Sequence, residues 1–353
     1  EIDMCNGSIM DKLISFSLPL MLSGILQLMF NAVDIIVVGQ FTGSQALAAV
    51  GSTTALIAVF TNLFIGISLG ANVLAARFYA SGKHKEMSET VHTSITLALI
   101  SGIIMAFVGL LFSKTALEIM STPDNVIDQS TLYMRIYFLG MPFFMLYNYG
   151  AAVLRAVGDT KRPLMFLIAA GIINACLNMV LVIVFNLGVA GVAIATIFSQ
   201  FISCVLVLRC LNKTDASYQL RFSKLKIKGY YLKQIFQVGI PAGIQSTVIN
   251  FSNVLLQSSV NSFGSVAMAG YTAANNIFGF LYASINAVTQ ACMSFTSQNY
   301  GAGRPDRVKK SYFISLGYSF GVGLALGSAL FFFGRTFLAL FTTESAVIDA
   351  GMK

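Results

Sequence analysis

The sequence predicts an all-α membrane protein that crosses the bilayer several times. Of its 353 residues, 56% are hydrophobic and only 10% are charged. A soluble protein carries about 25% charged residues, so this chain has too few charges to cover water-soluble domains. The low charge and high apolar content also argue against a disordered chain or a disulfide-rich scaffold. The chain is therefore expected to lie in a membrane.

Nine apolar segments are long enough to span a bilayer, which takes about 20 residues. We expect these spans at residues 13–38, 46–76, 91–112, 129–155, 163–185, 189–211, 235–262, 267–297 and 311–341. Pro19, Pro142 and Pro241 lie inside spans, where neighbouring helices can satisfy the carbonyl groups that a proline leaves free. The prediction is a polytopic helical protein.

Basic residues are distributed unevenly among the loops. Most of the 22 lysines and arginines lie in or beside the loops after the second, fourth, sixth and eighth spans, whereas the loops after the first, fifth and seventh hold none. Cytoplasmic loops are enriched in Lys and Arg. We therefore predict a multi-pass protein of the cell membrane with a cytoplasmic N-terminus. The net charge of +8 is a topology signal and implies no nucleic-acid partner.

An internal repeat runs through the chain. Phe41–Ala48 recurs as Ser262–Ala269 when the glycines are aligned, and Tyr79–Lys83 recurs as Tyr300–Arg304. Both matches have a spacing of about 220 residues, and matches at one register indicate a duplicated unit.

The repeat divides the chain into two bundles. We predict a six-helix transmembrane bundle over 1–211, a basic cytoplasmic linker over 212–231, and a second bundle over 232–353. Because six is even, the two bundles form a parallel, pseudo-symmetric repeat about an axis along the membrane normal. The chain ends at the counterpart of Leu132, so we expect the second bundle to be truncated after its third helix, in a protein of roughly 440 residues.

One acidic residue lies inside a span. Asp34 is near the outer end of the first span, and the other Asp and Glu residues lie in loops or at span ends. A carboxylate near the bilayer centre costs about 2.5–3.5 kcal/mol, so a function is the default explanation for it. Gln27, Asn31 and Asp34 follow helical spacing and share one face, which predicts a polar stripe toward a cavity. The alternative is that Asp34 only caps the helix at the outer surface.

Three further polar residues lie in the fifth and sixth spans. Asn174 and Asn178 are one helical turn apart, and Thr196 is in the middle of the next span. Their oxygens could bind a monovalent cation or hydrogen-bond a carboxylate, and interhelical packing is the alternative. Arg135 is the one basic residue inside a span that could pair with Asp34. Without such a fixed cation, burial favours the protonated carboxyl group, which can then alternate between a proton and a cation.

The sequence contains no pattern typical of a metal-binding site or of a catalytic site. His84 and His92 stand outside any metal-binding motif, and no catalytic constellation is visible in the spans. We therefore expect no enzyme activity, no cofactor, and no metal other than a possible Na⁺ at Asp34.

Several segments resemble the multidrug and toxic compound extrusion transporters. They are Phe16–Pro19, Asn31–Asp34, Leu154–Pro163, Gly188–Thr196 and Gln298–Gly303. The resemblance implies a pair of six-helix bundles that work by alternating access. It also implies export of organic cations or drugs, by a monomer in the bilayer, in exchange for H⁺ or Na⁺.

The resemblance also assigns roles to residues. It implies that Asp34 couples transport to the cation together with Asn174, Asn178 and Thr196. Members of the family often have a second aspartate at the position of Asn178, and its loss here leaves proton coupling open.

The seventh span differs from that of some relatives in having neutral polar residues where they carry a glutamate. Leu256 stands at the register of Asp34. We take as candidates for the substrate pocket Gln27, Asn31, Asn250, Asn253 and Gln257. The rival function is a lipid-linked precursor flippase, which would need a cationic cavity, and Arg135 alone could supply a charge for it.

Overall fold

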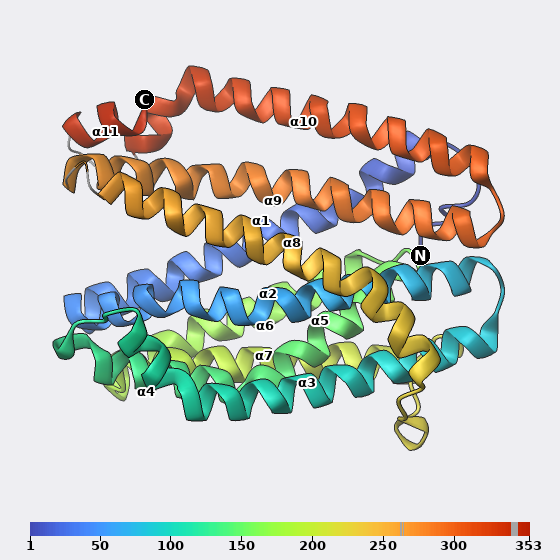
Figure 1. Cartoon of the computed structure of the whole chain (residues 1–353), viewed down its shortest axis with the longest axis horizontal. Coiled ribbons are helices and arrows are strands. Elements are labelled where there is room, and N and C mark those ends of the chain that lie inside the picture. Colours follow the sequence, from blue (N-terminus) through green and yellow to red (C-terminus); the bar gives the residue numbers. More distant parts are fainter. Residues whose placement is uncertain (262, 264, 340–344) are drawn as a thin grey trace.

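The computed structural model describes residues 1–261, 263, 265–339 and 345–353, and these form helices joined by short loops (Figure 1). No strand occurs among them. The helices are α1 (Ile9–Phe41), α2 (Ser44–Ala80), α3 (His84–Ile119), α4 (Asp124–Leu139), α5 (Met141–Ala156), α6 (Lys161–Asn178), α7 (Gly188–Lys213), α8 (Gly229–Asn261), α9 (Ser265–Gly301), α10 (Pro305–Ala339) and α11 (Ser345–Gly351). A π-helical turn covers Met179–Val184, and a 3₁₀ turn covers Phe222–Lys224.

The predicted spans coincide with these helices, with one break and one irregular end. The fourth predicted span is two helices, α4 and α5, which meet at Gly140 with a bend of 48°. Pro142 lies in the first turn of α5, where a missing N–H is tolerated, so a new helix begins there. The fifth predicted span ends α-helically at Asn178 and continues in the π-helical turn.

Length and composition allow six of the described helices to cross a membrane on their own, and the bent pair α4–α5 allows a seventh crossing. The helices α8 and α9 are as long as the others but too polar to pass the same test. Both lie among the other helices (Figure 1).

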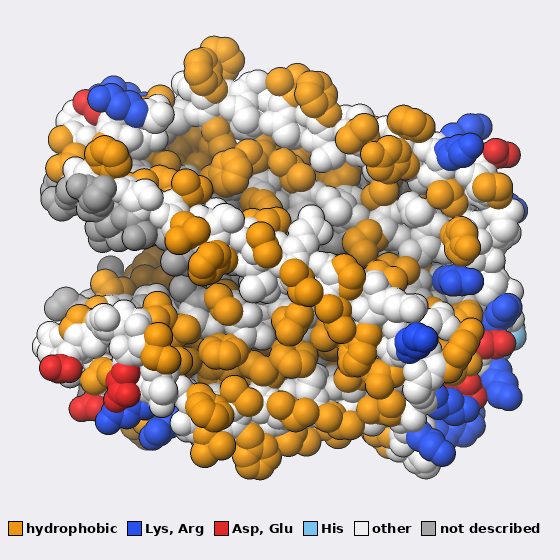
Figure 2. All heavy atoms as spheres, in the orientation of Figure 1, with side chains coloured by type: hydrophobic (Ala, Val, Ile, Leu, Met, Phe, Trp, Pro, Cys, Tyr) orange, Lys and Arg blue, Asp and Glu red, His pale blue; other side chains and the backbone are white. Residues whose placement is uncertain are grey.

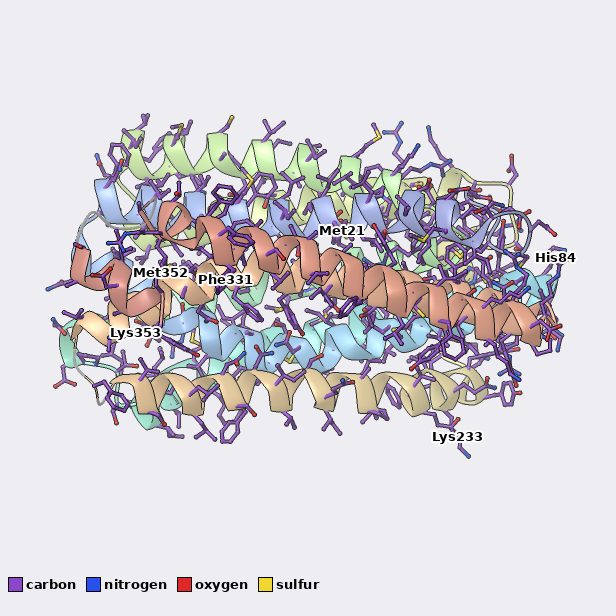
Figure 3. All side chains as sticks on the ribbon, turned by 90° about the horizontal axis from the view of Figure 1, so that it is seen from above. Met21, His84, Lys233, Phe331, Met352 and Lys353 are labelled. Atoms are coloured by element: carbon purple, nitrogen blue, oxygen red, sulfur yellow. The ribbon has the colours of Figure 1, made fainter. Side chains whose placement is uncertain are left out.

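The surface has the distribution of side chains that a bilayer requires. Large apolar side chains are exposed along the outside, such as Leu111, Phe320 and Phe331. Figure 2 shows them spread over the length of the molecule, with Lys, Arg, Asp and Glu gathered at its two ends. His84, the first residue of α3, and Lys353 lie at opposite ends of the long axis (Figure 3). We call the end with His84 the basic end.

The helices α1 and α8 each run diagonally across the bundle (Figure 1). At the basic end α1 packs against α9, where Phe16 and Phe295 are fully buried with ring centroids 6.2 Å apart. The other diagonal helix, α8, crosses α2 with almost no space between the backbones. A Cβ on Gly66 would lie 2.2 Å from Gly243 Cα, so both positions require glycine.

The match at Ser262 and Gly264, which supports the repeat, lies outside the described residues. The other matched pair falls at equivalent helix ends: Tyr79 is in the last turn of α2, and Tyr300 is in the last turn of α9. Loop glycines with positive φ follow both, Gly82 at 67° and Gly303 at 68°. Glycine adopts this left-handed conformation without steric cost.

Candidate functional site

Asp34 lies on α1 two turns before the helix ends, on the side that packs against α6. Its side chain is partly buried and accepts a hydrogen bond from Asn178 Nδ2. Asn178 is fully buried at the last α-helical position of α6, where the π-helical turn begins. Such turns often occur at functional sites because they displace side chains from regular helical positions.

Two amides and two hydroxyl groups continue from Asp34 into α6 and α7. Asn178 Nδ2 lies 3.0 Å from Asn174 Oδ1, and Asn174 Nδ2 lies 3.5 Å from Thr196 Oγ1 and 3.4 Å from Ser199 Oγ. The hydroxyl groups donate to the backbone of α7, Thr196 to Val192 O at 3.0 Å and Ser199 to Thr196 O at 2.8 Å. We call Asp34, Asn174, Asn178, Thr196 and Ser199 the acid–amide cluster.

One hydrogen bond of the acid–amide cluster is donated to the carboxylate, from Asn178 Nδ2 to Asp34 Oδ1. Because both hydroxyl hydrogens go to the backbone, Thr196 and Ser199 can only accept from Asn174. This leaves Asn174 Oδ1 to face Asn178, whose Nδ2 then faces Asp34. Donors aimed at a carboxylate stabilise its charged form.

One oxygen of the acid–amide cluster receives no hydrogen bond. Asn178 Oδ1 is buried and has no hydrogen-bond partner. A buried unpaired carbonyl oxygen is costly unless something binds to it. Together with the Asp34 carboxylate, it supplies the hard oxygen ligands that a monovalent cation takes.

The structure brings together four residues that the sequence analysis named for ion coupling, with a fifth that it did not name. Asp34, Asn174, Asn178 and Thr196 come together from α1, α6 and α7, although α1 lies more than 100 residues before the other two helices in the chain. Ser199 was missed, although it follows Thr196 by three residues and so shares its helical face. It is 7% exposed.

Four of the five residues predicted for the substrate pocket have described side chains, and these do not join the acid–amide cluster. Gln27 and Asn31 are exposed on α1. Asn250 donates to Ser246 O of its own helix at 2.8 Å, and Asn253 is exposed. The side chain of Gln257 lies outside the described residues.

Arg135 is not the partner of Asp34. It is exposed on α4, and among the described residues no ion pair joins it to Asp34. The carboxylate contacts the α6 amide instead, because α1 packs along α6. The possible pairing left open by the sequence is therefore not formed.

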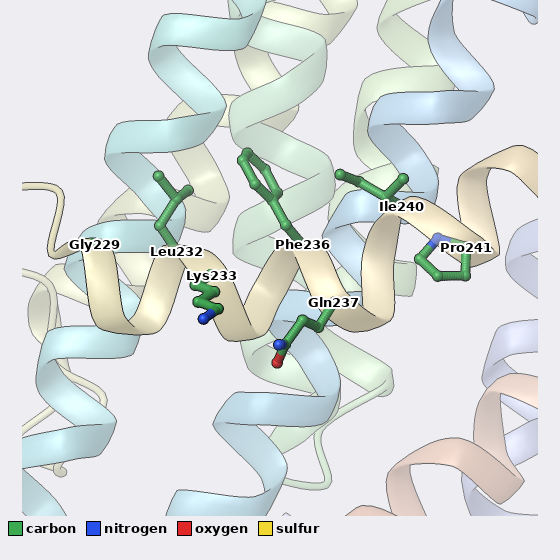
Figure 4. Close-up of a pocket in the computed structure, with 7 residues that line it drawn as sticks. All are labelled: Gly229, Leu232, Lys233, Phe236, Gln237, Ile240 and Pro241. Carbon is green, nitrogen blue, oxygen red and sulfur yellow. The ribbon is translucent and has the colours of Figure 1, made fainter.

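A groove of about 540 Å³ lies elsewhere, on α8 near the basic end (Figure 4). It is lined by Gly229, Leu232, Lys233, Phe236, Gln237, Ile240 and Pro241. The Lys233 and Gln237 side chains point to the opposite side from Leu232 and Phe236 (Figure 4), and Lys233 points away from the bundle (Figure 3). The groove contains no residue of the acid–amide cluster.

Polar contacts close the molecule at the basic end. Asn72 of α2 donates to Ala152 O at 2.9 Å and accepts from Ser294 of α9 at 3.1 Å. Gln298 of α9 donates to Ala156 O of α5 at 2.6 Å. We call these contacts between α9 and the helices α2 and α5 the seam. At the other end Figure 2 shows a hollow between the part that contains α9–α11 and the part that contains α2–α4.

Sequence comparisons identify relatives of known class. The family model described as MatE matches residues 19–180 and 241–353. The "Probable multidrug resistance protein YoeA" of Bacillus subtilis is 31% identical over 94% of this chain and 73% of its own length. The "Multidrug export protein MepA" of Staphylococcus aureus is 24% identical over 95% of this chain and 74% of its own. A "FAD transporter" of Shewanella oneidensis is 25% identical over 96% and 75%.

Solved structures have the same fold. One described as the outward-facing conformation of a multidrug resistance MATE family transporter superposes with a TM-score of 0.92, at 22% identity. A MATE crystal structure in the bent conformation superposes with a TM-score of 0.90. Each match covers 99% of this chain and 78% of the other chain. The fold is therefore the all-helical, multi-pass membrane fold of these proteins.

Proposed function

This chain belongs to the MatE family, and we propose that it is a secondary active exporter of organic cations or drugs, working by alternating access and coupled to H⁺ or Na⁺. The membership confirms the family resemblance found in the sequence. Its relatives include proteins named for multidrug resistance and multidrug export.

The observation that carries the proposal is the state of Asp34. Among the described residues, this carboxylate lies within a span, accepts its hydrogen bond from the neutral amide of Asn178, and forms no ion pair. A charge in the membrane without a fixed partner requires a mobile one. An organic cation, a proton and a sodium ion can each neutralise it, so binding of one displaces another.

We propose the sides of the membrane from the basic residues. The basic end faces the cytoplasm, with the N-terminus, and the hollow at the other end faces outward. Residues 1–211 form the first bundle, 212–231 the cytoplasmic linker, and 232–353 the beginning of the second bundle. With the seam closed and the other end hollow, the structure represents an outward-facing state, in which the coupling ion reaches Asp34 and the exported cation leaves.

Anionic substrates are disfavoured. FAD and lipid-linked pyrophosphates carry phosphate groups, which basic side chains recognise. Arg135, which could have supplied such a charge, is exposed and separate from the acid–amide cluster. The acid–amide cluster therefore offers no basic side chain to a phosphate group, as a flippase or a flavin-nucleotide exporter would need there.

The test is competitive binding of ethidium, a fluorescent organic cation, to the chain in lipid nanodiscs. We expect Na⁺ or acidification to displace ethidium from the wild-type chain, since each competes for Asp34. Asp34→Asn removes the charge and keeps the shape, so ethidium binding should weaken by about tenfold or more, the factor set by about 1.4 kcal/mol. FAD should not compete.

The matched control is Asp128→Asn, an exposed acid at the outer end of α4. It should bind ethidium and respond to the ion as the wild type does. The proposal is overturned if Asp34→Asn binds ethidium and loses it to Na⁺ or protons like the wild type. In that case Asp34 is only a structural residue.

A further inference from the structure

The segment before α1 has no regular secondary structure and is mostly exposed, yet it is tied to the rest of the molecule by many contacts. Residues 1–8 run along the basic end, and Ser8 caps α1 by accepting from Asp11 N at 3.4 Å. Within the segment, Met4 is fully buried in the cluster that contains Phe16 and Phe295. A segment held this firmly at the seam is fastened by specific contacts.

Most of these contacts come from the start of α10 and the end of α9. Arg307 donates hydrogen bonds from all three nitrogens of its guanidinium group. Nη2 donates to Met4 O at 3.1 Å, Nη1 to Gly7 O at 3.0 Å, and Nε to Asn299 Oδ1 at 3.0 Å. Asn299, fully buried, also donates to Met4 O at 3.2 Å. Hydrogen bonds from a charged donor are the stronger kind.

A second arginine and a lysine complete this side. Arg304 Nη1 donates to Cys5 O and, at 3.0 Å, to Asn6 Oδ1. Lys12, in the first turns of α1, donates at 2.5 Å to Asp3 O and Asn6 O. Four consecutive backbone carbonyls from Met4 to Gly7 therefore receive donors, three of them from α9, α10 or the turn between them and the fourth from Lys12 of α1.

The other side of the segment is bound to the first bundle. Ile2 N donates to Gly158 O at 3.0 Å, in the turn between α5 and α6. The Glu1 carboxylate accepts from Tyr79 Oη at 3.1 Å and from Tyr218 of the linker. Burial raises the pKa of Tyr218 to about 12, so its hydroxyl group stays protonated and donates.

We propose that residues 1–7 are a strap that holds the cytoplasmic side of the transporter closed. The strap crosses the seam: its first two residues bind α2, the turn after α5 and the linker, and residues 4–7 bind α9, α10 and the turn between them. The seam cannot part while both attachments hold, because only Asp3 separates Ile2 from Met4, and two residues of chain span at most about 7 Å. Opening toward the cytoplasm therefore requires one attachment to let go.

The attachment that releases is the one at Glu1 and Ile2. On the other side, arginine donors, the buried Met4 side chain and the start of α1 all belong to one packed cluster with α9. At Glu1 and Ile2 the strap has one backbone hydrogen bond and contacts of an exposed carboxylate. The strap therefore travels with α9 and α10 and leaves Gly158, Tyr79 and Tyr218.

The strap contains its own reporter. Cys5 is a free, partly buried cysteine, and burial raises the pKa of its thiol, which slows its reaction with maleimides. We would measure maleimide labelling of Cys5 in nanodiscs, with the other four cysteines replaced by alanine. A second reporter, Ser294→Cys in an otherwise cysteine-free chain, measures exposure of the seam itself.

Arg307→Gln is expected to speed labelling of both reporters by about tenfold, the factor that follows from losing one charge-assisted hydrogen bond. Tyr218→Phe, a mild change at the other attachment, should speed both by about threefold. The matched control is Lys310→Gln, which removes an exposed positive charge one turn further along α10 and should change neither rate.

Two results would overturn the strap. In the first, Arg307→Gln and Tyr218→Phe would leave the labelling rates of both reporters unchanged. In the second, the variants would speed labelling of Cys5 but not of Ser294→Cys, which would mean that the segment covers the seam without holding it closed. The inference rests on the proposed alternating-access cycle. Labelling needs neither substrate nor an ion gradient, whereas the proposed function is tested by ethidium binding. The strap proposal and the proposed function can therefore fail independently.

Discussion

The helices α1 and α8 begin the two halves of the repeat, and they differ in what they contribute. Near the outer end of α1, Asp34 is held by an amide of α6. At the same register α8 has Leu256, which is 55% exposed. The crossing with the other half differs as well. The α1–α9 contact is filled by Phe16 and Phe295, whereas α8 lies on α2 through Gly66 and Gly243.

This comparison shows that α1 contributes a charged side chain, whereas α8 contributes a close helix–helix contact. A helix that carries a charge needs a neighbour that supplies a donor, and α6 supplies one to α1 through Asn178. A helix that crosses another at backbone contact needs glycine at the crossing point, because glycine has no side chain to keep the backbones apart. The two helices have corresponding places in the predicted repeat, but their side chains differ, so that α1 carries the proposed ion site and α8 forms the tight crossing.

The largest effect is expected from exchanging the acid between the two helices. The double variant Asp34→Leu with Leu256→Asp keeps the composition, but the new carboxylate lacks the amide and hydroxyl groups that surround Asp34. Ion-dependent displacement of ethidium should be lost, as in Asp34→Asn. Recovery of displacement in the double variant would show that any acid at this register is enough, and the comparison of α1 with α8 would fail.

A smaller effect is expected at the glycine crossing. In Gly66→Val the side chain would overlap the α8 backbone, and overpacking costs about 1–3 kcal/mol. The thermal unfolding midpoint in nanodiscs should fall clearly. Gly317→Val on α10 is the control, since no atom lies within 4 Å of its added Cβ. Equal midpoints for the two variants would contradict a tight α2–α8 contact.

The smallest effect is expected from Ser199→Ala, which removes one acceptor from Asn174. A hydrogen bond of this kind is worth about 0.5–1.5 kcal/mol, so ethidium affinity should fall about threefold. Ser252→Ala on α8 is the control, because that hydroxyl bonds only its own helix, to Val248 O. A loss as large as that of Asp34→Asn would mean that Ser199 contacts the ion directly.

Much of the fold could be predicted because span and loop differ so strongly in composition. The bounds of most helices follow the apolar runs within a few residues, and Asp34, Asn174 and Asn178 stand out as polar residues in such runs. The bend at Gly140 was missed. It lies inside one continuous apolar run, where hydropathy cannot separate one kinked crossing from two helices.

The amino-acid sequence by itself determined that the chain lies in a membrane, that its two parts repeat, and that Asp34 is the acid in a span. These are properties of composition and spacing. Only the tertiary structure decided that Asp34 contacts Asn178 instead of Arg135, that Ser199 joins the acid–amide cluster, and that residues 1–7 cross the seam. Such contacts join residues far apart in the chain, and they depend on how helices cross, which no local pattern of residues specifies.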